Sequence, residues 1–143
     1  MANFFKVGSG ATDNPSNIIT ISAPTAKGTN DYETMEFPVG TDYQVPSGKT
    51  LYITKIIAGT NAGSADFAIG YGDTGVANGT TPPTNFVQIT PNRMYPFKYV
   101  NGSGSSGVTT DIDVWIPIPA LKYPCVRSNG TAGAYVSAIG ILV

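Results

Sequence analysis

The chain has 143 residues with eight basic and nine acidic side chains, no histidine, and only 12% charged residues. Soluble domains usually carry about 25% charged residues, and histidine is both the proton-exchanging side chain near neutral pH and the commonest metal ligand. The composition therefore excludes most general-base, nucleophile-activating and zinc chemistry, and the absence of a basic stripe excludes a typical nucleic-acid binder. We expect no catalytic residue, no metal and no cofactor.

The length fits one domain, and we expect residues 1–143 to form a single one. No run of about eighteen apolar residues is present to span a membrane, and residues 1–10 lack the apolar centre of a signal peptide. We therefore expect no membrane partner and synthesis in the cytoplasm. The single cysteine, Cys125, has no partner for an internal disulfide and is expected to be a small buried apolar residue.

Short runs of β-branched and aromatic residues alternate with clusters of Gly, Pro, Asn and Ser, and no window keeps the spacing of an amphipathic helix. The expected strands, in chain order, are residues 4–7, 17–22, 32–37, 49–59, 65–71, 85–90, 95–100, 111–118 and 134–143. Tight turns are expected at Pro46–Ser47–Gly48 and at three Asn-Gly pairs that begin at Asn78, Asn101 and Asn129. Eight or nine strands without a helix predict an all-β, single-domain antiparallel β-sandwich of the jelly-roll type.

Alternation assigns faces within two of these strands, 65–71 and 111–118. Phe67 and Ile69 are expected in the core. In the strand at 111–118, one face is apolar and the other holds two aspartates and a tryptophan; the apolar set is Ile112, Val114, Ile116 and Ile118. Pro117 and Pro119 remove backbone donors, so this strand ends at a sheet edge or lies along it.

The strand at 49–59 does not alternate cleanly, because Lys55 shares parity with Leu51, Ile53 and Ile57. Two arrangements resolve this conflict. One is a β-bulge near Lys55, and the other is burial on both faces with the lysine at the rim.

Trp115 lies on the face opposite the apolar side of its strand, where a sandwich meets water. An indole in that position needs a cover, which is either a loop of this chain, a ligand or another subunit. Phe4 and Phe5 belong either to a first strand or to an N-terminal arm, residues 1–16, that packs on a neighbour. The candidate partner contacts are Phe4, Phe5, Trp115 and Tyr123.

Asp111 and Asp113 lie two residues apart on one strand and so share a face. Two carboxylates about 5 to 9.5 Å apart can hydrolyse a glycosidic bond. Solvated acids on an exposed face are the favoured interpretation, because charged residues are mostly exposed. Asp13 and Asp73 each stand alone in their loops, which does not match a calcium-binding loop.

Three segments carry a family resemblance: Val45-Pro46-Ser47-Gly48-Lys49-Thr50-Leu51-Tyr52-Ile53-Thr54-Lys55-Ile56, then Phe67-Ala68-Ile69-Gly70-Tyr71-Gly72-Asp73, then Trp115-Ile116-Pro117-Ile118-Pro119. They are similar to small virion β-sandwich proteins of tailed bacteriophages, in particular capsid decoration (cement) proteins. The resemblance implies a homotrimer on the outer capsid surface of the virion, which clamps neighbouring subunits of the major capsid protein without catalysis. It also implies an N-terminal extension that reaches an adjoining subunit, at the place of Phe4 and Phe5.

Two other functions stay open. The first is a receptor- or carbohydrate-binding module of the tail-fibre type, with Trp115 or tyrosines such as Tyr71 and Tyr123 as a stacking platform. The second is a glycosidase that uses Asp111 and Asp113.

Overall fold

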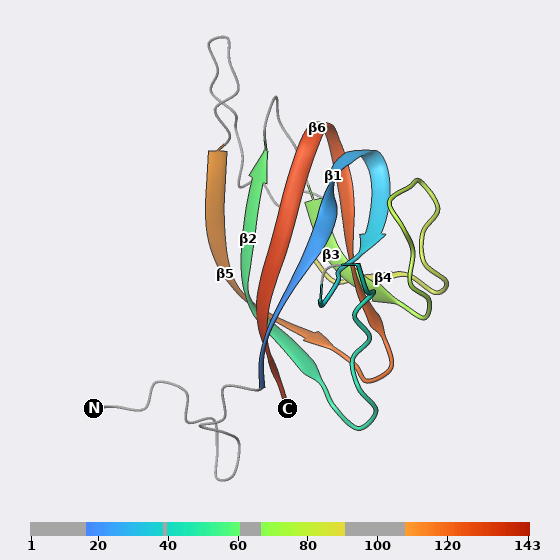
Figure 1. Ribbon diagram of the computed structural model, residues 1–143, viewed down its shortest axis with the longest axis vertical. Coiled ribbons are helices and arrows are strands. Elements are labelled where there is room, and N and C mark those ends of the chain that lie inside the picture. The colour runs from blue at the N-terminus through green and yellow to red at the C-terminus, as the bar shows by residue number, and fades with distance from the viewer. Residues whose placement is uncertain (1–16, 39, 61–66, 91–107) are drawn as a thin grey trace, which may run out of the picture.

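The computed structural model describes residues 17–38, 40–60, 67–90 and 108–143. These residues form six strands and no α-helix (Figure 1). The strands are β1 (Ile18–Thr34), β2 (Leu51–Thr60), β3 (Phe67–Gly72), β4 (Val87–Gln88), β5 (Val108–Ile118) and β6 (Tyr123–Leu142). The expected strands at 4–7 and 95–100 and the turn at Asn101 lie outside the described residues.

Two long strands, β1 and β6, are shared by both layers of the fold. Each arches over at the top of Figure 1, so that each supplies one segment to either layer. The first sheet has the order β1–β6–β2–β5, using residues 18–23 of β1 and 134–142 of β6. The second has the order β1–β6–β3–β4, using residues 32–34 and 123–128. Every pairing is antiparallel, and the predicted all-β antiparallel β-sandwich is confirmed.

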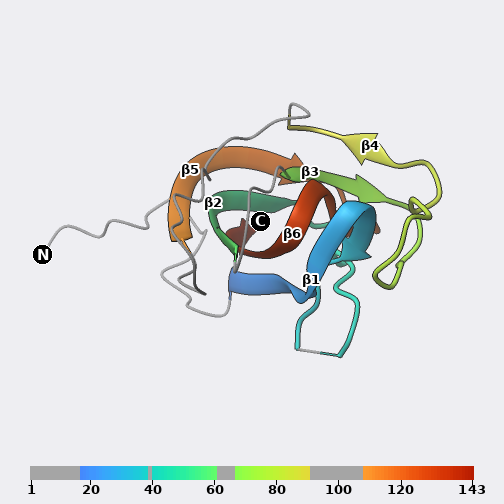
Figure 2. The same cartoon turned by 90° about the horizontal axis from the view of Figure 1, so that it is seen from above.

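Seen from above, β2 and β5 lie on one side of β6, and β3 and β4 lie on the other (Figure 2). The apolar core fills the space between the two sheets. Its largest fully buried side chains are Ile21, Met35, Val45, Leu51, Ile53, Ile56, Phe67, Ile69, Ile118, Val126 and Val136. Burying such a side chain contributes about 1.5 to 3 kcal/mol each, so this interior is the main source of stability.

The predicted faces agree with this core. Phe67 and Ile69 are buried, as are Ile116 and Ile118 of β5, while Trp115 points away from the core. The neighbouring Ile112 and Val114 pack against the core from a partly exposed position. As expected for a strand that contains Pro117, β5 is an edge strand of its sheet.

The conflict at Lys55 is resolved by an irregularity in strand register, which is one of the two arrangements expected from the sequence. The register of β2 shifts between Ile53 and Lys55 against both β5 and β6. Before the shift Leu51 and Ile53 are buried, and after it Ile56 and Ala58 are buried, so the buried parity changes. A bulge of this kind bends the strand and increases its local twist.

The structure confirms one expected turn and differs from the expectations at three other places. The turn at Pro46–Ser47–Gly48 is present, because Lys49 N donates to Pro46 O over 3.2 Å and Gly48 has a positive φ of 72°. The turn at Asn129 is wrong: Asn129 lies within β6 and pairs with Thr29 where the two long strands arch over. The first half of β6 was not anticipated. The strand at 85–90 is shorter than expected, since only Val87–Gln88 pairs as β4.

Gly140 tests how tightly β6 packs on β2. A Cβ at this position would lie 2.7 Å from Leu51 Cδ1 and 2.8 Å from the backbone oxygen of Tyr52. We expect Gly140→Ala to lower the free energy of unfolding by about 1 to 3 kcal/mol, because the extra methyl overpacks a close contact. Denaturant titration measures the change. The matched control is Gly79→Ala, where the nearest atom is 4.0 Å away, and equal stability of the two variants would contradict this packing.

Candidate interaction surface

The outward face of the second sheet is covered by the chain itself. Residues of the segment 73–86 lie against it: Pro83 packs on Gly72, and the ring of Phe86 lies so close to Gly70 that a Cβ there would be 2.8 Å from the ring. Phe86 also meets Tyr32 edge-on at 5.2 Å between ring centroids. The guanidinium of Arg127 also lies over the Tyr32 ring, 5.7 Å from the ring centroid. This face therefore has an aromatic cover supplied in the same chain.

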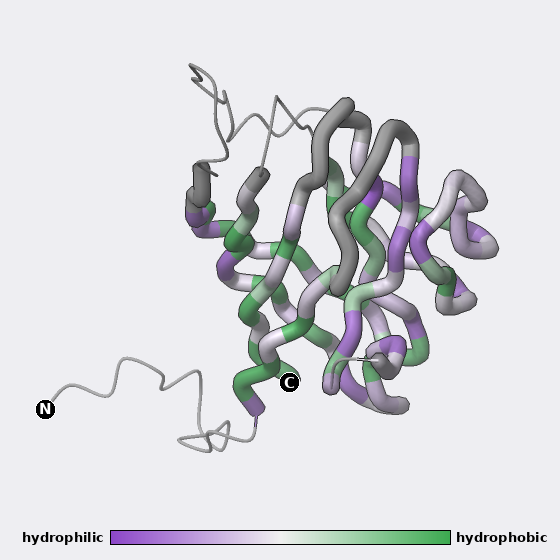
Figure 3. The backbone as a smooth tube through the Cα atoms, turned by 45° about the horizontal axis from the view of Figure 1, so that its top comes forward, coloured by the Kyte–Doolittle hydropathy of each residue, from purple (hydrophilic) through white to green (hydrophobic). Residues whose placement is uncertain are grey.

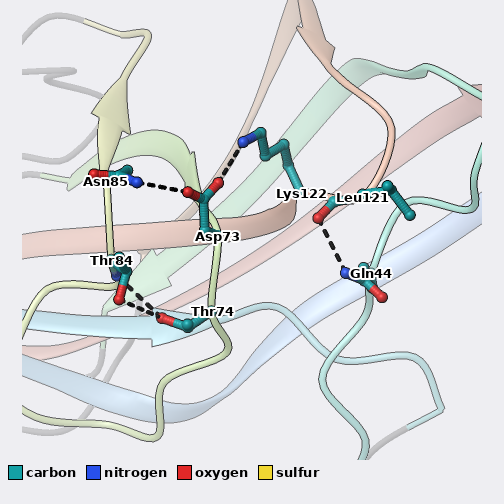
Figure 4. Close-up of polar contacts among 7 residues, drawn as sticks. All are labelled: Gln44, Asp73, Thr74, Thr84, Asn85, Leu121 and Lys122. Atoms are coloured by element: carbon teal, nitrogen blue, oxygen red, sulfur yellow. Dashed lines mark hydrogen bonds and ion pairs between the residues drawn. The ribbon is translucent and has the colours of Figure 1, made fainter.

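Polar contacts fasten that covering segment (Figure 4). Asp73 forms an ion pair with Lys122, which lies in the turn between β5 and β6, and accepts a hydrogen bond of 2.7 Å from Asn85. These two donors hold the pKa of Asp73 below its usual range, with Lys122 the larger cause. Thr84 N donates to Thr74 Oγ1 over 3.0 Å. Asp73 therefore holds this loop in place through its contacts with Lys122 and Asn85.

The outward face of the first sheet is different, because apolar side chains line up across all four strands. Ile18 of β1 lies opposite Ile141 of β6, Ile141 opposite Tyr52 of β2, and Tyr52 opposite Pro117 of β5. Directly opposed residues share a face and touch. Trp115 stacks on Tyr52 with 4.9 Å between ring centroids and 29° between ring planes. We call Ile18, Ile141, Tyr52, Pro117 and Trp115 the apolar row.

The apolar row is exposed at Ile18, Pro117 and Trp115 and partly buried at Tyr52 and Ile141. Trp115 is 61% exposed and Ile18 is 43% exposed, so the described parts of the chain do not cover them. Figure 3 shows green, hydrophobic stretches of backbone beside the C-terminus. Single exposed apolar residues are ordinary, but a contiguous exposed patch marks a binding surface. The row is the best candidate for such a surface among the described residues.

Three charged side chains lie beside the row on β2 and β5. Lys55 Nζ is 3.0 Å from Asp111 Oδ2 and 3.3 Å from Asp113 Oδ1. These hydrogen bonds raise the pKa of Lys55, and the bond from Lys55 lowers the pKa of Asp111. A glycosidase needs a general acid whose pKa is raised. The hydrogen bond from Lys55 instead lowers the pKa of Asp111, so this carboxylate stays ionised.

The structure describes two of the four candidate partner contacts, Trp115 and Tyr123, and they belong to different sheets. Trp115 is in the apolar row. Tyr123 is half-buried at the start of β6, opposite Gly72 in the second sheet, and Tyr71 packs against the core. The three aromatic side chains therefore do not form one platform. Phe4 and Phe5 lie outside the described residues.

Tyr52, Ile18 and Ile141 were not anticipated as surface partners of Trp115. A signal for Tyr52 exists in the sequence, because Tyr52 has the parity opposite to the buried pair Leu51 and Ile53. Its cross-strand neighbour Ile141, and Ile18 beyond it, can be identified only once the register of the strands is known.

Within the described residues, no three His, Cys, Asp or Glu side chains are grouped so that they could hold a metal ion. The same part of the chain contains no helix with the length and apolar character needed to cross a membrane.

Lys55→Gln tests the charged group beside the row. Removing the ammonium should let the pKa of Asp111 rise toward its ordinary value of 3.8. Because the folded pKa is lowered, the stabilising contribution of this pair is present above the ordinary carboxyl pKa and is lost as the pH falls through the folded one. An NMR titration of the Asp111 carboxyl carbon measures the shift, with Thr54→Ser as control. Identical titration midpoints in Lys55→Gln and the native protein would contradict the assignment.

Comparison of the chain with known protein families, with curated proteins and with solved structures gives no match.

Proposed function

We propose that the protein is a non-enzymatic virion structural protein, a capsid decoration (cement) protein. It binds the outer capsid surface as a homo-oligomer, a trimer, and stabilises the shell. The observation that carries this proposal is the exposed apolar row on the outward face of the first sheet.

The chemistry of the row suits a protein partner. Interface cores are enriched in aromatic residues and depleted of charge, with polar groups at the rim. Here Tyr52 and Trp115 stack at the β2 and β5 end of the row, and the charged group around Lys55 lies beside them. Tyr and Trp are also the residue types that most often dominate binding energy. On a shell with many identical sites, several linked copies gain avidity, so modest affinity at each row is enough.

The second candidate function is a receptor- or carbohydrate-binding module. One observation favours it: the exposed indole of Trp115 lies near hydrogen-bonding groups of Lys55 and Asp113. An aromatic face with adjacent polar groups can stack on a sugar ring. The row, however, continues through Ile18 and Ile141, which offer a pyranose no hydrogen bond. A protein surface uses the whole row, and we therefore prefer the decoration function.

Trp115→Ser tests the role of the row in attachment. The purified protein should be a trimer by analytical ultracentrifugation and should co-sediment with phage capsids that lack it. We expect Trp115→Ser to weaken capsid binding about ten-fold or more, because truncating a central aromatic contact costs at least about 1.4 kcal/mol. The matched control is Val87→Ser, an exposed apolar residue of β4 in the second sheet.

Two results would count against this function. A monomer that does not sediment with capsids would exclude attachment, and equal binding by Trp115→Ser and Val87→Ser would exclude the row as the attachment surface. Trp115 is the chain's one tryptophan, so its fluorescence during a glycan titration tests the carbohydrate alternative directly.

A further inference from the structure

We propose that Asn78 is a site of self-modification, at which the side-chain amide is converted to a carboxylate through a cyclic imide formed with Gly79. The pairing of Gly79 with Tyr32 controls the rate of this conversion. The inference goes beyond the proposed function and does not depend on it.

The segment that covers the second sheet is held on β1 at two points, one on either side of Asn78. At the first point, Thr34 N donates to Val76 O over 3.0 Å, and Val76 N donates to Thr34 Oγ1 over 2.8 Å. At the second, Tyr32 N donates to Gly79 O over 2.7 Å, and Gly79 N donates to Tyr32 O over 3.2 Å. Asn78 lies between these points and is exposed. Its amide is therefore open to water, while the peptide group that follows it is held in place.

The two residues supply every atom that the first step needs. The backbone nitrogen of Gly79 attacks Cγ of Asn78, so that the N–Cγ bond forms and the Cγ–Nδ2 bond breaks. The amide group leaves as ammonia and takes the proton of the Gly79 nitrogen. Water then opens the imide to aspartate or to isoaspartate. Glycine has no Cβ to shield its nitrogen, and the space beside Gly79 is open, because a Cβ built there has its nearest neighbour, Ala77 O, at 4.0 Å.

The bridge to Tyr32 opposes this reaction in the folded protein. The Gly79 N–H is engaged with Tyr32 O, and the nitrogen has to leave that bond and turn toward Cγ of Asn78 before it can attack. Local opening of such a contact is an equilibrium with its own free energy. The folded protein therefore converts more slowly than the unfolded chain, by a factor that the opening of this bridge sets.

Conversion alters the contact that restrained it. The new carboxylate adds one negative charge to a chain of net charge −1, and isoaspartate also lengthens the backbone by one methylene before Gly79. The longer backbone no longer matches the register of Gly79 with Tyr32. The Tyr32 ring contacts Phe86 and Arg127, so the change reaches the aromatic cover of the second sheet.

Peptide mapping by mass spectrometry measures the conversion and separates Asn78 from the other two Asn-Gly pairs, at Asn101 and Asn129. The protein is incubated at neutral pH with and without guanidinium chloride. We expect Asn78 to convert about ten-fold or more slowly in the folded protein, since two hydrogen bonds must open first. Equal rates in the two conditions, or an intact Asn78 in the unfolded chain, would overturn the proposal.

Gly79→Ala tests the imide route. The added methyl shields the attacking nitrogen, so we expect several-fold slower conversion of Asn78 in guanidinium chloride, where folding has no influence on the result. The matched control is Thr80→Ala, which leaves both reacting residues in place and should convert at the native rate. A Gly79→Ala rate equal to the native one would exclude the imide.

Thr34→Val tests the restraint in the folded protein. It removes the hydroxyl that accepts the Val76 N–H while keeping the size of the side chain. We expect Asn78 to convert about five-fold faster when folded, because one hydrogen bond fewer holds the segment, and at the native rate when unfolded. The control is Thr54→Val, which loses a hydroxyl contact with Ile139 O on the first sheet. Equal folded rates in the two variants would contradict the restraint.

Hydrogen exchange at the Tyr32 amide tests the consequence. This amide donates to Gly79 O, so we expect it to exchange faster in the isoaspartate form than in the native protein. Unchanged protection of Tyr32 in the converted protein would show that the bridge survives and would overturn this last step.

Discussion

The pairing of β1 with β6 is the interaction on which the rest of the structure depends. β6 is hydrogen-bonded to β1, β2 and β3, and its two halves belong to opposite sheets. Pairing continues where the strands arch over, through Lys27 with Ala134 and Thr29 with Asn129, with irregular register between these pairs. Two continuous strands run through both layers. The residues that face the core in one sheet therefore also determine which residues face it in the other.

The two sheets of this framework differ in how their outward faces are covered. The outward face of the second sheet is covered by the segment 73–86, which is held by the ion pair of Asp73 with Lys122 and places Phe86 over Gly70. On the first sheet Tyr52 faces outward because Leu51 and Ile53 on either side of it are buried, and it meets Trp115 there. This contrast between a covered and an open face is the reason why we propose the first sheet as the binding surface.

Sequence patterns predicted those features that depend on local parity. The alternation of 111–118 correctly separated Ile116 and Ile118 from Trp115. The misplaced parity of Lys55 indicated two possible arrangements, and the structure shows one of them, a shift of register between Ile53 and Lys55. Asn129-Gly130 has the chemistry of a tight turn, yet pairing with β1 keeps this part of β6 in a strand. The apolar row could not be predicted from the sequence. It joins residues 18, 141, 52 and 117 through the registers of three strand pairs, β1 with β6, β6 with β2 and β2 with β5. A single sequence gives the face of a residue and not its cross-strand neighbour.

The central claim is that the first sheet attaches through its outward face. Hydroxyl-radical footprinting of the free and capsid-bound protein, analysed by mass spectrometry, tests it most directly, because it reports the solvent access of individual side chains. The account predicts that Tyr52, Trp115 and Ile141 lose reactivity on the capsid, while Val87 of β4 and Leu121 of the turn between β5 and β6 keep theirs. Protection of Val87 and Leu121 with an unchanged Trp115 would contradict it.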